Sequence, residues 1–183
     1  MMKKRWTQSV SRGVAVAVLA LAGVVAAPQA NAAVQQPYLV CIGSGAEEYN
    51  PPITITPQVT SITFTEEYSS CTSLGSPTVT DGGVVYGGPR TANCLVELAA
   101  EEPFAANYNW NQGSLESVVA WNEIIRVRAL NGTTTITSHG GVIEGLGLGR
   151  SVTRTIVLPQ LSATACATTG VSSNTGTATL TIL

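Results

Sequence analysis

The sequence predicts an all-β protein with the architecture of an antiparallel β-sandwich. Two disulfides are expected to cross-link it, and a signal peptide that is cleaved is expected to direct its export. Short runs rich in Thr, Val and Ile are separated by turn residues, and the chain contains 18 Gly and 9 Pro. This pattern is typical of sandwiches and barrels. Strong helix formers are almost absent, and four Cys are present. Charged residues make up 11% of the chain, which excludes coiled coils, long helical bundles and charge-rich disordered chains.

The first element is a secretory signal over residues 1–32. A basic head containing Lys3 and Arg12 precedes the uncharged apolar run Gly13–Ala27, and the small-residue sequence Ala30-Asn31-Ala32 follows. At 1.5 Å per residue the apolar run spans about 22 Å, short of the roughly 30 Å hydrocarbon core. We therefore interpret it as a signal peptide cleaved after Ala32 and not as a membrane anchor. Residues 33–183 then form a single secreted domain.

The exported domain is acidic once the signal is removed. It contains five Arg, no Lys and all eleven acids of the chain, which gives a net charge of −6. A nucleic-acid-binding protein needs a basic patch that neutralises phosphates, and anionic membranes repel an acidic surface in the same way. We therefore expect no nucleic-acid partner, and no membrane contact after signal cleavage.

All four cysteines, Cys41, Cys71, Cys94 and Cys166, lie in the exported part. An even number in an oxidising compartment predicts two disulfides. Of the three connectivities we favour Cys41–Cys71, which brackets an N-terminal hairpin-like segment, and Cys94–Cys166, which ties a middle strand to a late one. The chain has a single His and no CxxC motif, so the Cys spacing matches no zinc site. No metal and no cofactor are expected.

The first half of the domain contains one clear strand and several irregular segments. In residues 59–68, Ile62 and Phe64 fall on one face of a period-two alternation, which predicts a strand with one buried face. The Gly-rich residues 82–89 predict a loop. Residues 95–103 are the one stretch of good helix formers, and Pro103 ends it.

The longest strand candidate covers residues 117–130. Val119, Trp121, Ile125 and Val127 are expected on its buried face. A straight strand of this length would span about 43 Å, which is unusually long, so we expect a bend or bulge near Asn122–Glu123.

Short strands and Gly-containing turns complete the domain. Asn131-Gly132 predicts a tight hairpin turn between residues 124–130 and 133–138. Gly140-Gly141 is expected to turn the chain into the strand 142–148. Two further strands are expected over 151–158 and 176–183, the last with Ala178, Leu180 and Ile182 buried.

Residues 94–166 resemble an immunoglobulin domain, in which a Trp packs on a disulfide between two sheets. Here Trp110 follows Cys94 by 16 positions and Cys166 follows it by 72. The exported chain also resembles small secreted β-rich proteins of actinobacteria, with its Trp110-Asn111-Gln112-Gly113 stretch and Thr-rich strands. These resemblances imply an immunoglobulin-like sandwich and a location outside the cell, and they imply no activity.

Catalytic patterns are weak. Ser138, His139 and Glu144 would make a conceivable triad, but adjacent residues of a strand face opposite ways and no GxSxG elbow is present. The adjacent acids Glu47-Glu48 and Glu66-Glu67 would each place one carboxyl in a cleft, and we interpret them as surface acids that favour solubility. We therefore expect no enzyme.

The sequence thus favours a secreted, non-catalytic module that binds partners or plays a structural role at or near the cell surface. Tyr108 and Trp110 are candidate sugar-stacking rings, so that cell-wall polysaccharide is one expected partner and a secreted protein another. One alternative is a protease inhibitor that presents a loop over residues 82–90, with Arg90 as the specificity residue. A second alternative is a small extracellular hydrolase. The oligomeric state stays open.

Overall fold

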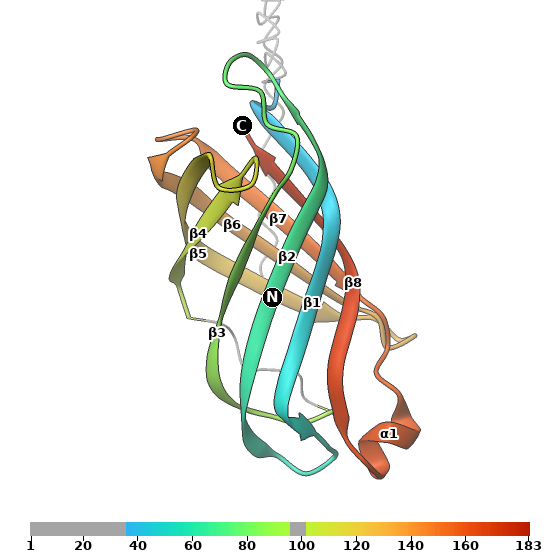
Figure 1. Ribbon diagram of the computed structural model, residues 1–183. Helices are drawn as coiled ribbons and strands as arrows, with labels where there is room; N and C mark the ends of the chain where they lie inside the picture. The colour runs from blue at the N-terminus through green and yellow to red at the C-terminus, as the bar shows by residue number, and fades with distance from the viewer. Residues whose placement is uncertain (1–35, 96–101) are drawn as a thin grey trace, which may run out of the picture. The chain divides into compact units, whose positions relative to one another are not determined.

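A computed structural model describes residues 36–95 and 102–183, which belong to the compact unit Val34–Leu183 (Figure 1). The signal-peptide prediction over residues 1–32 lies outside these residues. Most of the helix prediction over residues 95–103 lies outside them as well.

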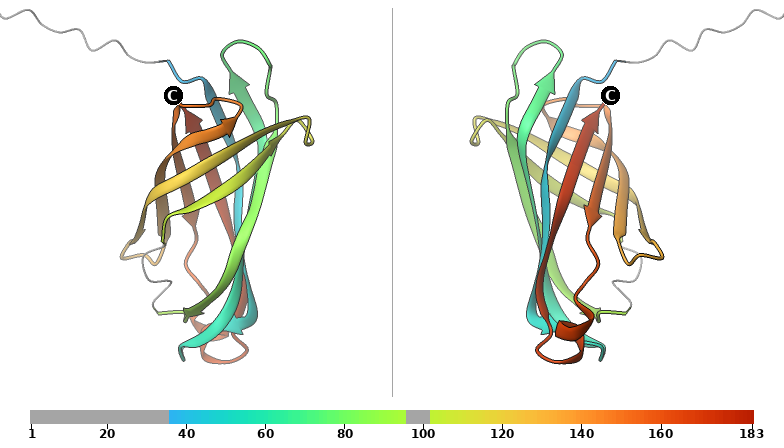
Figure 2. Two further views of the ribbon diagram at one scale, coloured as in Figure 1. Left: turned by 90° about the vertical axis from the view of Figure 1, so that its left-hand side faces the viewer. Right: turned by 90° about the vertical axis from the view of Figure 1, so that its right-hand side faces the viewer.

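Eight antiparallel strands close into a single barrel in the order β1 to β8, because β1 pairs with both β2 and β8 (Figures 1 and 2). The all-β prediction is confirmed, and the sandwich prediction is wrong. The elements are β1 Leu39–Ile53, β2 Gln58–Ser73, β3 Gly82–Ala92, β4 Phe104–Trp110, β5 Leu115–Arg128, β6 Thr134–Gly145, β7 Ser151–Leu158, α1 Ala163–Ala167 and β8 Val171–Ile182.

The connectivity also excludes the immunoglobulin-like variant. Each strand pairs with its neighbours in the sequence, which is the up-and-down arrangement of simple barrels. An immunoglobulin domain instead divides its strands between two sheets through Greek-key connections. The alternation of inward and outward residues is the same in both architectures, so the sequence pattern could not separate them.

Both predicted disulfides are confirmed. Cys41 and Cys71 are direct partners in the β1–β2 register. Cys94, just after β3, is bonded to Cys166 in α1. The second bridge closes a separation of 72 residues and attaches the short helix that precedes β8 to the end of β3.

The predicted strands of the second half are largely correct. The strand over residues 151–158 coincides with β7, and the last strand buries Ala178, Leu180 and Ile182 as expected. The Asn131-Gly132 turn joins β5 to β6, but it is wider than two residues, since the nitrogen of Ala129 bonds the carbonyl of Thr133.

The turn predicted at Gly140-Gly141 is wrong. Both glycines lie inside β6, and the chain turns at residues 146–149 instead. A Cβ on Gly140 would lie 2.2 Å from the carbonyl oxygen of Ala120, so glycine serves close strand approach at this position and not a turn.

The Gly-rich segment predicted as a loop is strand β3, which pairs with β2 along its whole length. A Cβ on Gly83 would lie 2.5 Å from the carbonyl oxygen of Glu66, so the bare backbone permits the close approach of the two strands. Proline in a strand is tolerated at an edge. Pro89 fits this rule, because the ladder between β3 and β4 ends at Gly83.

The predicted irregularity in β5 is confirmed by a register shift between Trp121 and Glu123. One extra residue reverses the inward and outward faces of the strand beyond it. Arg126 therefore points into the barrel, whereas Ile125 and Val127 are 44% and 58% exposed. The prediction that Ile125 and Val127 share the buried face of Trp121 is wrong.

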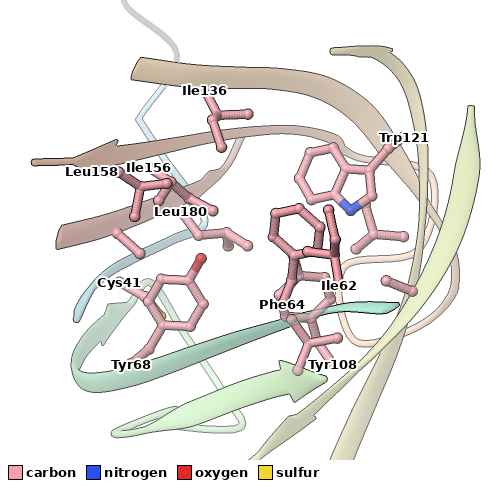
Figure 3. Packing of buried hydrophobic residues seen from close by; sticks show 14 of the residues in the cluster. Cys41, Ile62, Phe64, Tyr68, Tyr108, Trp121, Ile136, Ile156, Leu158 and Leu180 are labelled. Carbon is pink, nitrogen blue, oxygen red and sulfur yellow. The ribbon is translucent and has the colours of Figure 1, made fainter. Parts of the chain in front are cut away.

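Aromatic rings fill much of the barrel interior (Figure 3). Tyr108 and Trp110 are fully buried, and their ring centroids lie 5.6 Å apart. The indole nitrogen of Trp110 donates a hydrogen bond of 2.9 Å to Oγ of Ser117. The indole nitrogen of buried Trp121 has no hydrogen-bond partner among the residues that the structure describes.

Candidate functional site

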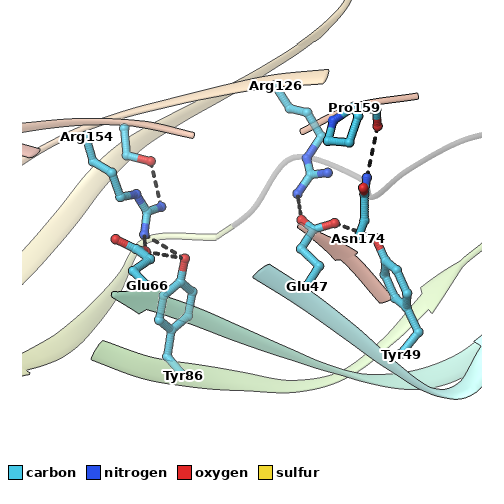
Figure 4. Close-up of polar contacts among 9 residues, drawn as sticks. Glu47, Tyr49, Glu66, Tyr86, Arg126, Arg154, Pro159 and Asn174 are labelled. Atoms are coloured by element: carbon cyan, nitrogen blue, oxygen red, sulfur yellow. Dashed lines mark hydrogen bonds and ion pairs between the residues drawn. The ribbon is translucent and has the colours of Figure 1, made fainter. Parts of the chain in front are cut away.

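Two arginine–glutamate ion pairs cross the barrel interior (Figure 4). Arg154 of β7 lies 2.6 Å from Glu66 of β2, and their side chains are 1% and 0% exposed. Arg126 of β5 lies 2.7 Å from Glu47 of β1. In both pairs the two strands are not neighbours in the sheet, so each pair connects opposite walls. The interpretation of Glu47 and Glu66 as surface acids is wrong.

Glu66 lies at the centre of a buried hydrogen-bond network. Its Oε2 accepts bonds from the hydroxyls of Tyr68, at 2.7 Å, and Tyr108, at 3.2 Å. Its Oε1 accepts from Tyr86 at 3.1 Å and from Nη1 of Arg154 at 2.6 Å. Nη2 of Arg154 in turn donates to Oγ of Ser138. The carboxylate is thus held by four donors.

The network also fixes the protonation of two tyrosines. Burial, and next the negative charge of Glu66, raise the pKa of Tyr68 and Tyr108 well above the ordinary value of a phenol. Both hydroxyls therefore remain donors under ordinary conditions. The second pair is built in a similar way, because the hydroxyl of Tyr49 donates to Oε2 of Glu47.

These contacts favour a structural role for the interior. The charges are compensated, the rings pack against one another, and Glu66 and Arg154 are both 1% exposed. In this structure the carboxylate of Glu66 is bonded to Arg154 and to three tyrosine hydroxyls.

A groove of about 830 Å³ lies on the outside of the barrel, across β2, β3 and β4. Its centre is a row of three cross-strand neighbours, in which Gly83 lies between Glu67 and Asn109. Because Gly83 has no side chain, the row is hollow at its middle. The outward polar residues that line the groove are Thr65, Glu67, Ser69, Asp81, Asn107, Asn109 and Gln112.

The β4–β5 turn forms one end of this groove. Asn111 and Gln112 both adopt the left-handed backbone conformation, with φ of 50° and 60°. The side chain of Asn111 holds the segment before β3, since it accepts from the nitrogen of Thr80 and donates to the carbonyl of Thr78. Positive φ at both central residues is the geometry of a tight hairpin turn, and the nitrogen of Gly113 closes this turn by donating to the carbonyl of Trp110.

The ring pair predicted to bind sugar lies inside the barrel and not on its surface. Tyr108 and Trp110 are 0% exposed and offer no face to an external sugar ring. Their neighbours in β4, Asn107 and Asn109, point outward and line the groove instead. The Trp110-Asn111-Gln112-Gly113 stretch, which carries the resemblance to small secreted β-rich proteins, forms the end of β4 and the turn after it, and Gln112 and Gly113 line the groove.

The residues named for the two alternative functions lie on strands of the barrel. Arg90 lies within β3 opposite Thr60 of β2, half-buried, and not on a protruding loop. Ser138 points into the barrel and binds Arg154. His139 is exposed on the outside, where its Nδ1 lies 3.3 Å from Oγ1 of Thr153. Ser138 and His139 thus face opposite sides of β6.

The described ranges contain no group of three or more His, Cys, Asp or Glu side chains that could hold a metal ion. Within residues 36–95 and 102–183, no helix has the length and apolar character needed to cross a membrane. No family model, curated protein or solved structure matches the chain.

Proposed function

We propose that the protein is a secreted, non-catalytic binding module whose partner occupies the groove across β2, β3 and β4. Two disulfides are consistent with an oxidising location outside the cell. The first 32 residues also support export, because they have the basic head, apolar run and small-residue cleavage site of a signal peptide. The buried ion pairs and rings leave the outer surface as the place where recognition takes place.

The groove is the observation that carries this proposal. Its volume of about 830 Å³ falls within the roughly 300–1,000 Å³ of ligand sites. Outward hydrogen-bonding side chains from three strands and one turn converge on it, and Asn111 holds the turn in place. The strands make the site rigid, so a partner does not have to order it on binding.

The charge around the groove favours a cationic partner. Glu67 and Asp81 line it, and exposed Glu116 is the cross-strand neighbour of Asn109. The exported part has five Arg against eleven acids, and two of these arginines are paired with acids inside the barrel. The net charge of −6 is therefore carried outside these pairs. An acidic surface attracts basic partners and repels acidic ones. A basic secreted protein therefore fits the groove better than an anionic wall polymer.

The test is a pull-down with oxidised residues 33–183 as bait, offered secreted proteins, purified cell wall and insoluble polysaccharides. Asn109→Trp fills the groove from an exposed position. Thr179→Trp is the matched control, on exposed β8 surface outside the groove. We expect the wild type and Thr179→Trp to capture the same partner, and we expect Asn109→Trp to capture none. Retention of nothing by the wild type, or equal retention by both variants, would contradict the proposal.

A further inference from the structure

The barrel has one short seam, between β3 and β4. Only two residue pairs join these strands, Gly82 with Trp110 and Gly83 with Asn109. By contrast, β4 pairs with β5 along its whole length. In the described part of the chain, no strand pairs with the other edge of β4 over residues 104–108. Such an edge presents main-chain N–H and C=O groups on which another strand can form.

The open edge of β4 and the groove are continuous. Asn107 lies on this edge and lines the groove, together with Asn109 where the ladder ends. Ala105 and Asn107 are exposed on the outer face of the strand. Val85, which is 67% exposed, stands on the opposite side of the seam. The seam thus offers main-chain hydrogen bonding, one apolar contact and nearby carboxylates.

We propose that this seam binds an extended, basic segment of another polypeptide, which adds to β4 as a strand along residues 104–108. The inference rests on the proposed function and names the form of the partner. Main-chain pairing supplies affinity in strand addition, and side-chain pockets supply specificity. Five residues of strand span about 17 Å, the ordinary length of a β-strand.

The charge of the surface decides between occupants. Glu67, Asp81 and Glu116 lie at the paired end of the seam, near Gly83 and Asn109, and favour Lys or Arg at the end of the added strand that lies next to them. A second copy of this chain brings another net charge of −6 and no Lys outside the signal, so self-association at this edge is disfavoured. A polysaccharide has no regular main-chain amides with which to continue the sheet.

The probe is a blocked peptide of about seven residues with alternating Lys and Val, and its control carries N-methyl groups on alternate amides. The control keeps the charge and the side chains but cannot donate to a strand edge. Calorimetry measures affinity for oxidised residues 33–183, and hydrogen exchange measures protection of the amides at 104–108. We expect slowed exchange at these amides, and binding weaker by about tenfold for the methylated peptide.

Two variants, each of which removes one negative charge, test whether the acids near the seam contribute to binding. Glu67 lies beside the groove, whereas exposed Glu48 lies on β1 outside it. We expect Glu67→Gln to weaken binding by about threefold and Glu48→Gln to leave it unchanged. Equal binding of both peptides, or protection elsewhere, would overturn strand addition. If Asn109→Trp still abolishes capture of a partner in that case, the proposed function stands and this inference alone fails.

Discussion

Replacement of Glu66 by Gln should be among the most destabilising single changes in the barrel. The carboxylate is 1% exposed and accepts hydrogen bonds from Arg154 and three tyrosine hydroxyls. Gln removes the charge while the guanidinium of Arg154 remains buried. Loss of one partner of a buried pair costs about 3–5 kcal/mol. At roughly 2–4 °C per kcal/mol for a domain of this size, the Tm should fall by about 6–20 °C.

The assay is urea and thermal unfolding of oxidised residues 33–183, followed by near-UV circular dichroism of the buried aromatic rings. Glu67→Gln is the matched control, because Glu67 is the next residue and is exposed, where loss of a charge has little effect. Replacement of both Glu66 and Arg154 by apolar residues should recover part of the loss, since no lone charge stays buried. If Glu66→Gln costs no more than Glu67→Gln, the buried ion pair is refuted.

Three further predictions concern the interior. The two buried tyrosines that donate to Oε2 of Glu66 have raised pKa values, so their contribution to the free energy of unfolding should not depend on pH below about pH 10. Above it, the unfolded state ionises first and stability should fall by up to about 1.4 kcal/mol per pH unit and tyrosine; a flat urea midpoint to pH 11 would contradict this. Joint replacement of Cys94 and Cys166 by Ser should cost about 4.4 kcal/mol for a 72-residue separation, measured by urea unfolding, whereas an unchanged midpoint would argue against the bridge. Trp110→Phe should cost about 1 kcal/mol more than Trp121→Phe in the same assay, because only the first loses an indole hydrogen bond; equal losses would contradict the contact.

Strands with a regular alternation were predictable from the sequence. β7 and the end of β8 were found because inward and outward residues alternate locally, and local periodicity needs no knowledge of the partner strand. Closure of the barrel was not predictable in this way. It depends on pairing between β1 and β8, in which Leu39 lies opposite Ile182. No local pattern in either strand indicates that β1 and β8 pair.

In the first half of the domain, strand position and not composition decides the structure. The glycines of β3 favour a loop by composition, but in the structure they permit close approach to β2. A charged residue such as Glu66 favours the surface by composition, but it follows Ile62 and Phe64 at even spacing and so lies on their buried face. That spacing was the available signal for a buried acid. The groove was harder to predict from the sequence, because the side chains that line it come from separate strands.

The two buried ion pairs specify the register of the closed barrel. An eight-stranded barrel has an interior just wide enough for side chains to fill, and here the pairs connect β2 with β7 and β1 with β5 across it. Each arginine meets its acid only if the opposing walls are in the correct register, so a slipped strand would leave a charge buried alone. Buried pairs of this kind favour one closed register over its neighbours. The short seam, where two residue pairs join β3 to β4, includes no strand of either ion pair, so the strand addition that we propose there would leave both pairs in place.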